Sequence, residues 1–366
     1  MKKTLLVLTL LALGSPAYAQ FGGIGGAVKR AQQVQDTKKK LDDLTFSEEE
    51  EQTIGLDVSQ KVRQRFGVVQ DPAVHKYVSL VGTTLAKLTE RPDLPWTFVV
   101  LDTDGVNAFA SPGGYVHITR GALGLIDNEA ELAGVLGHEI GHVVRKHTLN
   151  AIRKNSAVQL GASATAERSS LLASVGSAVY SNVLENAYDR GDELDADRLG
   201  VELPSKAGYN AGGLASFLTR LDERNKDQAE KNGLFASHPD TKERIDKAAA
   251  LAKGSKTSAT AQARYKSHIK YEPAPITAIA VVADGASGLT GSTKAAEPKE
   301  EPKKKGFGLG ALKPAVAPEK QSSQVSASGG ARGVGPDRAA KGGGNPAIVK
   351  TTVSAAELTE FKKGIA

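Results

Sequence analysis

The sequence predicts an α+β protein that is mostly helical, with a small β-sheet or hairpin and a disordered C-terminal tail. Three observations support this class. Apolar residues recur at helical spacing through Asn128–Asn150, which predicts a long buried helix. Only a few short runs are rich in β-branched and aromatic residues, as strands are. After about Lys253 the composition shifts to Gly, Ser, Ala, Pro and Lys, which is typical of chains that bury too little apolar surface to fold.

The N-terminus has the pattern of an export signal. Two lysines precede the apolar run Leu5–Leu13 and the sequence Ala17–Ala19, so we expect cleavage after Ala19. The apolar run is too short to span a membrane, and no other stretch approaches about 18 uninterrupted apolar residues. Cysteine is absent, so neither a lipid anchor on a cysteine nor a disulfide is expected. We therefore expect a periplasmic protein that is neither lipidated nor transmembrane.

Five segments follow from these patterns. They are a signal peptide (1–19), a flexible or helical lead (20–46), one folded domain (47–252), a largely disordered linker (253–348) and a short C-terminal helix (349–366).

Two helices are predicted at the start of the folded domain. Ser47 with Glu50 three residues later forms a capping box, which begins a helix that runs to about Phe66. A second helix is expected from Asp71-Pro72 through Lys87, because its apolar residues fall on one side.

Three strands are predicted next. Trp96–Leu101 is β-branched and aromatic, and Val106–Ala110 and Tyr115–Thr119 form a hairpin around Pro112-Gly113-Gly114. If the hairpin lies beside the Asn128–Asn150 helix, its open edge could accept an extended peptide as an added strand, although a purely structural hairpin is an equal alternative.

The residues of this candidate substrate edge are Asn107, Ala108, Phe109 and Ala110. His117 alternates along the second strand of the hairpin, and we expect it to be exposed rather than a metal ligand.

The long helix carries two histidines four residues apart. A helix turns about 100° per residue, so His138 and His142 project from one face and lie about 6 Å apart along the axis. Two imidazoles in this arrangement can occupy two corners of a tetrahedral zinc site. Glu139 lies one step round the helix, where it could hold and deprotonate water. The alternative is an ordinary surface helix, but the apolar residues around the histidines argue against it.

A zinc site of this kind needs a third protein ligand. A later histidine of the pattern H-E-x-x-H-x-x-G-x-x-H is excluded, because Arg145 and Thr148 stand at the required positions. His147 is five residues beyond His142 and is expected to point off the shared face.

A carboxylate from a second helix is the other solution, and Asp192–Leu199 supplies candidates. Glu193 and Asp197 are four residues apart and share a helix face, although an acidic pair alone is more often a solvated surface. We expect Glu193 to be the third ligand and Asp197 to accept an N–H from a ligand histidine. Asp195 falls on another face and is expected at the surface.

The intervening and following segments offer further candidates. Ala151–Asn186 is rich in small residues and reads as two amphipathic helices or a mobile flap. Tyr188 or Arg190 could stabilise an oxyanion, although a structural role is an equal alternative. Gly208–Arg224 is expected to be a core helix. His238 is either a fourth metal ligand that closes the resting site, a transition-state donor, or the cap of the next helix.

The C-terminal part carries little chemistry. Residues 292–366 hold 13 Lys/Arg against 7 Asp/Glu, an excess that equals the net charge of the whole chain, +6. No nucleic-acid-binding motif is visible, so no nucleic acid partner is expected. A basic tail could contact anionic membrane or cell-wall polymer, although a solvated linker is the simpler interpretation. Ile276–Val282 could add a short strand, and Val353–Lys363 is predicted to be a capped helix.

The motifs H-E-I-G-H and E-L-D-A-D together resemble the gluzincin zinc metallopeptidases, the family of the bacterial β-barrel-assembly-enhancing protease, HtpX and the CAAX prenyl endopeptidases. Asn107–Ile118 resembles the family's strand pair, and Ser237–Ile245 resembles its closing S-H-P-x-x-x-x-R motif. The resemblance covers about residues 47–250. It implies one Zn²⁺, held by His138, His142 and Glu193, in an endopeptidase.

The sequence thus predicts a zinc-dependent endopeptidase for unfolded or misassembled envelope proteins, with Glu139 as general base and then acid. A periplasmic chaperone or scaffold with a closed zinc site and little proteolysis is the main alternative. A weaker third option is an envelope adhesion or lipid-binding protein.

Overall fold

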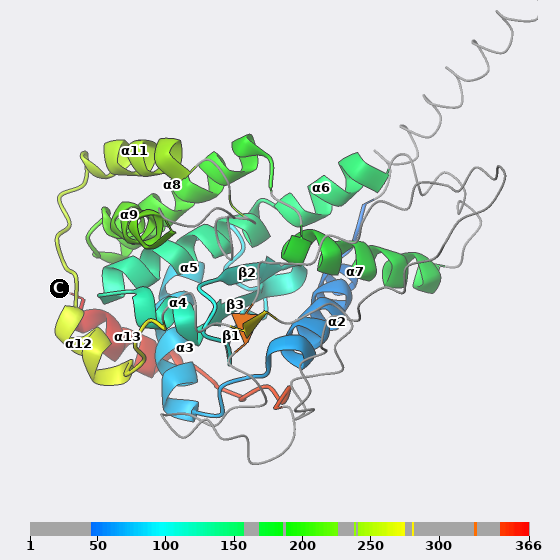
Figure 1. The fold of residues 1–366 in the computed structure, drawn as a ribbon, viewed down its shortest axis with the longest axis horizontal. Coiled ribbons are helices and arrows are strands. Elements are labelled where there is room, and N and C mark those ends of the chain that lie inside the picture. The colour runs from blue at the N-terminus through cyan, green and yellow to red at the C-terminus, as the bar shows by residue number, and fades with distance from the viewer. Residues whose placement is uncertain are drawn as a thin grey trace, which may run out of the picture.

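A computed structural model describes residues 45–156, 168–185, 188–225, 238, 241–274, 280–281, 326–327 and 345–365 of the chain. This part is mostly helical with a small three-stranded sheet, which confirms the predicted α+β class (Figure 1). None of the helices within these ranges combines the length and apolar character needed to cross a bilayer. The predicted signal peptide, the lead as far as residue 44 and most of the predicted linker lie outside the described residues.

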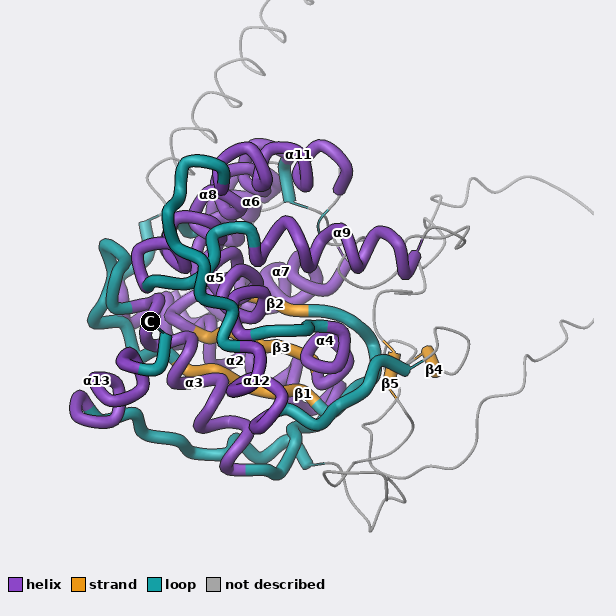
Figure 2. The backbone as a smooth tube through the Cα atoms, turned by 90° about the vertical axis from the view of Figure 1, so that its left-hand side faces the viewer, coloured by secondary structure: helices purple, strands orange, loops and turns teal. Residues whose placement is uncertain are grey.

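The sheet is built from β1 (Thr97–Leu101), β2 (Ala108–Ser111) and β3 (Tyr115–Thr119) in the order β1-β3-β2. β2 and β3 pair antiparallel, which confirms the predicted hairpin, and β1 pairs parallel with β3. Figure 2 shows the three strands stacked in this order. The turn η1 (Pro112–Gly114) needs its glycines, because Gly113 and Gly114 adopt φ values of 74° and 97°.

Alternate residues of the strands face two separate layers of helices. Phe98 and Val100 join the larger core, which contains α3 (Pro72–Ala86) and the central helix α5 (Glu129–Val144). Their neighbours Val99 and Leu101 join a second core with α2 (Glu48–Phe66), α6 (His147–Ser156) and α7 (Arg168–Glu185). The sheet is therefore covered on both faces, and every strand residue except the first of β1 and of β3 is buried.

The predicted helix starts are confirmed by their caps. Ser47 and Glu50 form the expected capping box at α2, and the side chain of Asp71 accepts hydrogen bonds from the first turn of α3. Asn128 caps α5 in the same way.

The central helix is shorter than predicted. α5 ends at Val144 rather than continuing to Asn150, because Lys146 adopts a left-handed conformation with φ 57° and α6 begins at His147. Every residue of α5 is buried, and α8 (Arg190–Ala207) and α9 (Gly213–Asn225) pack against it. The predicted core helix at 208–224 thus appears as α9, while Gly208 ends α8 with φ 102°.

The remaining described elements are four helices and two short strands. They are α4 (Arg120–Leu125), α11 (Thr241–Ala252), α12 (Gln262–His268), α13 (Ala355–Lys363) and the two-residue strands β4 (Ala280–Val281) and β5 (Ser326–Ala327).

The core continues past residue 252, the predicted end of the folded domain. Tyr265 on α12 is buried, and its hydroxyl donates to the carbonyl of Leu123 at 2.6 Å. Ile269 and Ile365 are buried in the same core. These apolar residues are isolated within polar sequence, so their pattern gave no helical signal.

The C-terminal residues of the chain pack against the folded domain. The backbone N–H of Val68 donates to the carbonyl of Asn345 at 2.7 Å, and α13 packs on α3, where Lys76 and Glu357 pair at 2.8 Å. The predicted capping box of α13, formed by Ser354 and Glu357, is present.

The expectation that His117 is exposed is wrong. His117 lies opposite Val99 and Phe109 on the sheet face that packs on α2, and its side chain is fully buried. Its Nε2 lies 2.9 Å from the hydroxyl of Ser59 on α2. Burial, reinforced by the nearby positive charge of Arg63, lowers the pKa of His117 to about 3.

This burial predicts a specific loss of stability in acid. The folded protein holds His117 neutral while the unfolded chain protonates it near pH 6.5, so stability falls as the pH drops below that value. Between pH 7 and pH 5 the loss from this residue is about 2 kcal/mol. His117→Gln lacks the titration, so its unfolding free energy, measured in urea, should fall by about that much less over the same interval. Equal pH slopes for the two proteins would contradict a buried neutral imidazole.

Candidate active site

The site forms where α5 and α8 cross at short range. The crossing uses small residues, because a Cβ added at Gly141 would lie 3.1 Å from the Cα of Ala196. A Cβ added at Gly137 would lie 3.2 Å from the Cα of Gly200. Larger residues at these positions would force the helices apart. The close approach brings the acidic face of α8 to the histidines of α5.

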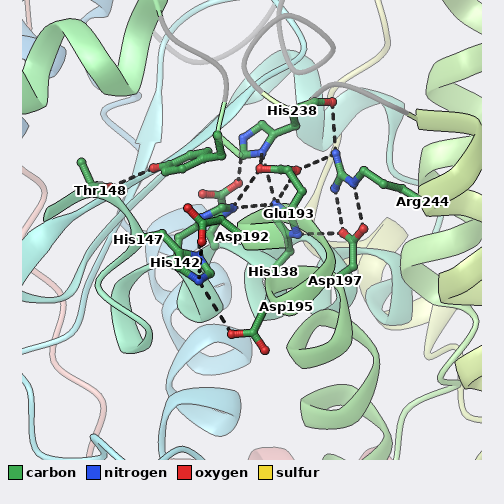
Figure 3. A network of polar contacts seen from close by, with 12 residues as sticks. His138, His142, His147, Thr148, Asp192, Glu193, Asp195, Asp197, His238 and Arg244 are labelled. Atoms are coloured by element: carbon green, nitrogen blue, oxygen red, sulfur yellow. Dashed lines mark hydrogen bonds and ion pairs between the residues drawn. The ribbon is translucent and has the colours of Figure 1, made fainter. Parts of the chain in front are cut away.

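Four buried side chains meet at this crossing, namely His138, His142, Glu193 and His238 (Figure 3). One candidate ligand atom from each lies within 4.8 Å of all the others. The two Nε2 atoms of His138 and His142 are 3.0 Å apart, and His142 Nε2 is 3.4 Å from Glu193 Oε1. His238 Nδ1 lies 2.7 Å from Glu193 Oε1 and 3.2 Å from His138 Nε2.

This arrangement fits a zinc ion. Zinc binds imidazole nitrogen and carboxylate oxygen at about 2.0–2.2 Å, so tetrahedral ligands are about 3.3 Å from one another. Three of the spacings within the cluster, at 3.0, 3.2 and 3.4 Å, are close to that value. A mixed nitrogen and oxygen set also suits zinc better than magnesium or calcium, which prefer oxygen alone.

Glu139 lies beside the cluster on α5. It is 1% exposed, and neither carboxylate oxygen has a hydrogen-bond partner among the described residues. His238 is close to it, with its Nε2 3.8 Å from Glu139 Oε1. Burial raises the pKa of Glu139, which brings a carboxylate towards the range that suits a general base.

A buried arginine connects the acidic residues behind the cluster. Arg244 donates to both oxygens of Asp197 at 2.8 and 2.7 Å, and its Nη1 lies 2.8 Å from Glu193 Oε2. It also donates to the carbonyl of His238 at 3.1 Å. Asp197 in turn lies 2.9 Å from Nδ1 of His138 (Figure 3). Arg244 therefore holds three residues of the site in place.

The charges around the site set the protonation states of its acids. Burial alone would raise the pKa of Glu193, but the charges of His238 and Arg244 outweigh it and hold that pKa well below its usual value. Burial opposes ionisation of Asp197 too, yet its hydrogen bonds with Arg244 and His138 lower its pKa to about 2. Both carboxylates are thus anionic at neutral pH.

The pKa values of the two helix histidines are shifted in opposite directions. Burial lowers the pKa of His142 well below its usual value, so its imidazole is neutral, as a metal ligand must be. Burial also disfavours charge on His138, but the contacts with Asp197 and Glu193 outweigh it and raise its pKa.

Comparison with known proteins assigns the family. Residues 72–252 match the profile of peptidase family M48. Metalloprotease YcaL of Escherichia coli is 30% identical over 175 residues, which cover 45% of this chain and 68% of that protein. The chain belongs to peptidase family M48. This confirms the resemblance drawn from the sequence motifs.

Two further relatives match about half of this chain. The beta-barrel assembly-enhancing protease of Yersinia pestis is 26% identical over 205 residues, covering 53% of this chain and 42% of that protein. The mitochondrial metalloendopeptidase OMA1 of Schizosaccharomyces pombe is 28% identical over 200 residues, covering 54% and 59% respectively. The chain spans less than half the length of the beta-barrel assembly-enhancing proteases that it matches.

The two oxyanion candidates of this M48 domain lie in different surroundings. The ring of Tyr188 stacks on His142 at 4.0 Å between centroids, and its hydroxyl is 2.9 Å from Thr148 Oγ1. Arg190 is exposed and pairs with Glu243 at 2.7 Å, so it is not directed at the cluster. The hypothesis that Arg190 stabilises an oxyanion is therefore not supported.

The candidate substrate edge lies close to the cluster. Within the described sheet β2 is an edge strand and contains Ala108, Phe109 and Ala110, with Asn107 directly before it. All four residues are buried. A narrow cleft lined by Ala110, Ser111, His142 and Lys146, among others, connects the end of β2 with the end of α5.

Two predictions about neighbouring residues have different outcomes. Asp195 lies at the surface as expected, paired with Arg198 at 2.7 Å. His147 does not join the converging ligands, as expected, but its Nδ1 lies 3.0 Å from Nδ1 of His142, a contact that the sequence pattern did not predict. That pattern assumed one continuous helix, whereas the left-handed turn at Lys146 redirects the chain. The S-H-P-x-x-x-x-R motif contains Arg244 but gives it no role, although two adjacent buried carboxylates signal a need for a cation.

Removing Arg244 should strongly destabilise the fold. Arg244→Met leaves two buried carboxylates without their counter-charge, which typically costs about 3–5 kcal/mol. Urea unfolding in excess chelator measures this without a contribution from bound metal. Arg190→Met is the matched control, since it removes an exposed ion pair nearby and should change stability little. Similar losses for the two variants would show that the buried network does not hold the crossing.

Proposed function

We propose that this protein is a zinc-dependent endopeptidase. The observation that carries the proposal is the crossing of two helices that brings His138, His142 and Glu193 together beside a buried carboxylate, Glu139, in an M48 chain. In this proposal the first three residues hold the metal and Glu139 performs the proton transfers.

The residues of the site have separate roles in the proposed reaction. Bound zinc would polarise the scissile carbonyl and lower the pKa of water. Glu139 takes the proton of the attacking water and later delivers it to the leaving amine. Its buried oxygens lack hydrogen-bond partners among the described residues, so they are free to accept a proton. Asp197 and Arg244 keep His138 and Glu193 in position.

Tyr188 is the candidate donor to the developing oxyanion. Burial raises its pKa, so it keeps its proton at neutral pH and can donate a hydrogen bond. Its hydroxyl contacts Thr148 rather than the cluster, so it must rotate or exchange partners when substrate binds.

His238 acts as a latch in this proposal. It supplies a fourth donor next to Glu193 and would close the coordination of the metal in the resting enzyme. A catalytic zinc needs one open position, so His238 must leave before a peptide is cleaved.

We propose unfolded or misassembled envelope proteins as substrates and the periplasm as the location. The support is the signal-like N-terminus, the likeness to beta-barrel assembly-enhancing proteases, and the edge strand β2 close to the cluster. An added strand is recognised through its backbone, which suits chains of varied sequence. The basic tail is proposed to contact anionic membrane or cell-wall polymer.

A second candidate is a chaperone or scaffold with a permanently closed zinc site. The position of His238 as a fourth donor favours it, because a four-ligand site is typical of structural zinc. Such a protein would leave substrate intact with or without a chelator.

Glu139→Gln should retain zinc but lose cleavage. The substitution removes the proton acceptor without removing a ligand, so casein cleavage should fall by at least about 100-fold. The measurements are casein digestion, with and without chelator, and zinc content by elemental analysis. Glu202→Gln is the control, because Glu202 is a partly exposed acid on α8 that pairs with Arg198, and its variant should cleave like wild type. Undiminished cleavage by pure Glu139→Gln would reject this mechanism.

A further inference from the structure

A fourth histidine lies behind the cluster without belonging to it. His147 is the first residue of α6 and is 4% exposed. It is not one of the four residues whose ligand atoms converge. Its Nδ1 instead faces Nδ1 of His142 at 3.0 Å, on the side of that ring opposite the cluster. The two rings are nearly perpendicular, with an interplanar angle of 77°.

This contact couples the protonation of the two rings. Two neutral imidazole nitrogens 3.0 Å apart form a hydrogen bond only if one carries the proton and the other accepts it. His142 can bind a metal through Nε2 only when that nitrogen is unprotonated, which leaves its proton on Nδ1. His147 must then accept at Nδ1 and carry its own proton on Nε2. The reverse arrangement would place a proton on Nε2 of His142, facing the cluster.

Two carboxylates favour the arrangement in which His147 carries its proton on Nε2. Asp192 and Asp195 each have an oxygen 3.7 Å from Nε2 of His147. At this distance they act mainly through their negative charge, which favours an N–H at the nitrogen that faces them. Asp195 is also held by Arg145 and Arg198. Asp192 is the more available of the two to act on His147, because its Oδ2 is buried and has no hydrogen-bond partner among the described residues.

We propose that His147 is a positioning residue that fixes His142 in the tautomer able to bind metal, with Asp192 and Asp195 setting its direction. The inference rests on the proposed function, in which His142 is a zinc ligand. The two ligand histidines of α5 are then oriented differently. Asp197 contacts His138 directly, whereas His142 is oriented by a carboxylate acting through a second imidazole.

The proposed role can be tested through zinc affinity and not only through activity. Full-length protein is stripped of metal and titrated with zinc against a chromophoric chelator. His147→Leu introduces an apolar side chain of similar size and removes the Nδ1 acceptor, so zinc affinity should fall by about 10–100-fold. His147→Asn places an amide oxygen close to the position of Nδ1, so it should stay within about threefold of wild type. Asp192→Asn should give an intermediate loss.

A matched control separates this effect from general damage. His117→Leu also replaces a buried histidine, one that contacts Ser59 on α2 and not the cluster, and it should leave zinc affinity unchanged whatever it does to stability. Thermal unfolding of each metal-free variant reports whether it folds. If His147→Leu does not fold, the tautomer of His147 in zinc-loaded wild type, read by ¹⁵N-imidazole NMR, still decides the question. The proposal requires a neutral ring protonated at Nε2.

The outcomes are distinguishable. Wild type that binds no zinc would overturn the proposed function, and this inference with it. Wild-type protein that binds zinc, together with a folded His147→Leu of equal affinity, would overturn only the role of His147. Equal losses in His147→Leu and His147→Asn would also overturn it, because they would indicate packing rather than hydrogen bonding. A His147 ring protonated at Nδ1 would do the same.

Discussion

The structure depends on the close crossing of α5 and α8. Glycines on α5 let the two backbones approach, and that approach places Glu193 and Asp197 beside the histidines of α5. Burying two carboxylates in this way is costly unless they are paired. Arg244 provides the counter-charge from α11, with direct contacts to both. The same contacts therefore set the geometry of the site and offset the cost of burying two carboxylates in the core.

The rest of the fold can be understood as a support for one fully buried helix. α5 has no exposed face, so it needs partners on all sides, and the sheet, α3, α8 and α9 supply them. Its N-terminal residue Glu129 is buried as well, and accepts hydrogen bonds from Tyr77 on α3 and from Arg264 on α12. Segments far apart in sequence thus meet at the start of the helix that carries the histidines. A rigid helix of this kind can hold two imidazoles and an acid at fixed spacing.

The sequence predicted local features well, because local rules determine them. Helical spacing located His138, Glu139 and His142, and capping patterns located the starts of α2, α3 and α13. The second helix with Glu193 and Asp197 followed from the chemical need for another ligand. Features that depend on tertiary contact were missed. Nothing in the strand pattern showed that His117 faces a helix, because both faces of the sheet are covered.

The unpredicted contact between His147 and His142 has a local cause. A single residue in a left-handed conformation, Lys146, ends the central helix early and turns His147 towards His142. Helical periodicity predicts the opposite direction, since it assumes an unbroken helix. Arg244 and Arg190 likewise differ only in tertiary position, since one is enclosed by acids and the other is exposed.

The central claim is that α5 and α8 together hold one metal ion. Its most direct test is the zinc content of purified full-length protein by elemental analysis, beside Glu193→Ala and Glu202→Ala. The account predicts about one zinc per chain in wild type and in Glu202→Ala, which changes only a partly exposed acid on the same helix. It predicts a clear loss in Glu193→Ala. A wild-type protein without zinc, or a Glu193→Ala variant with a full complement, would contradict it.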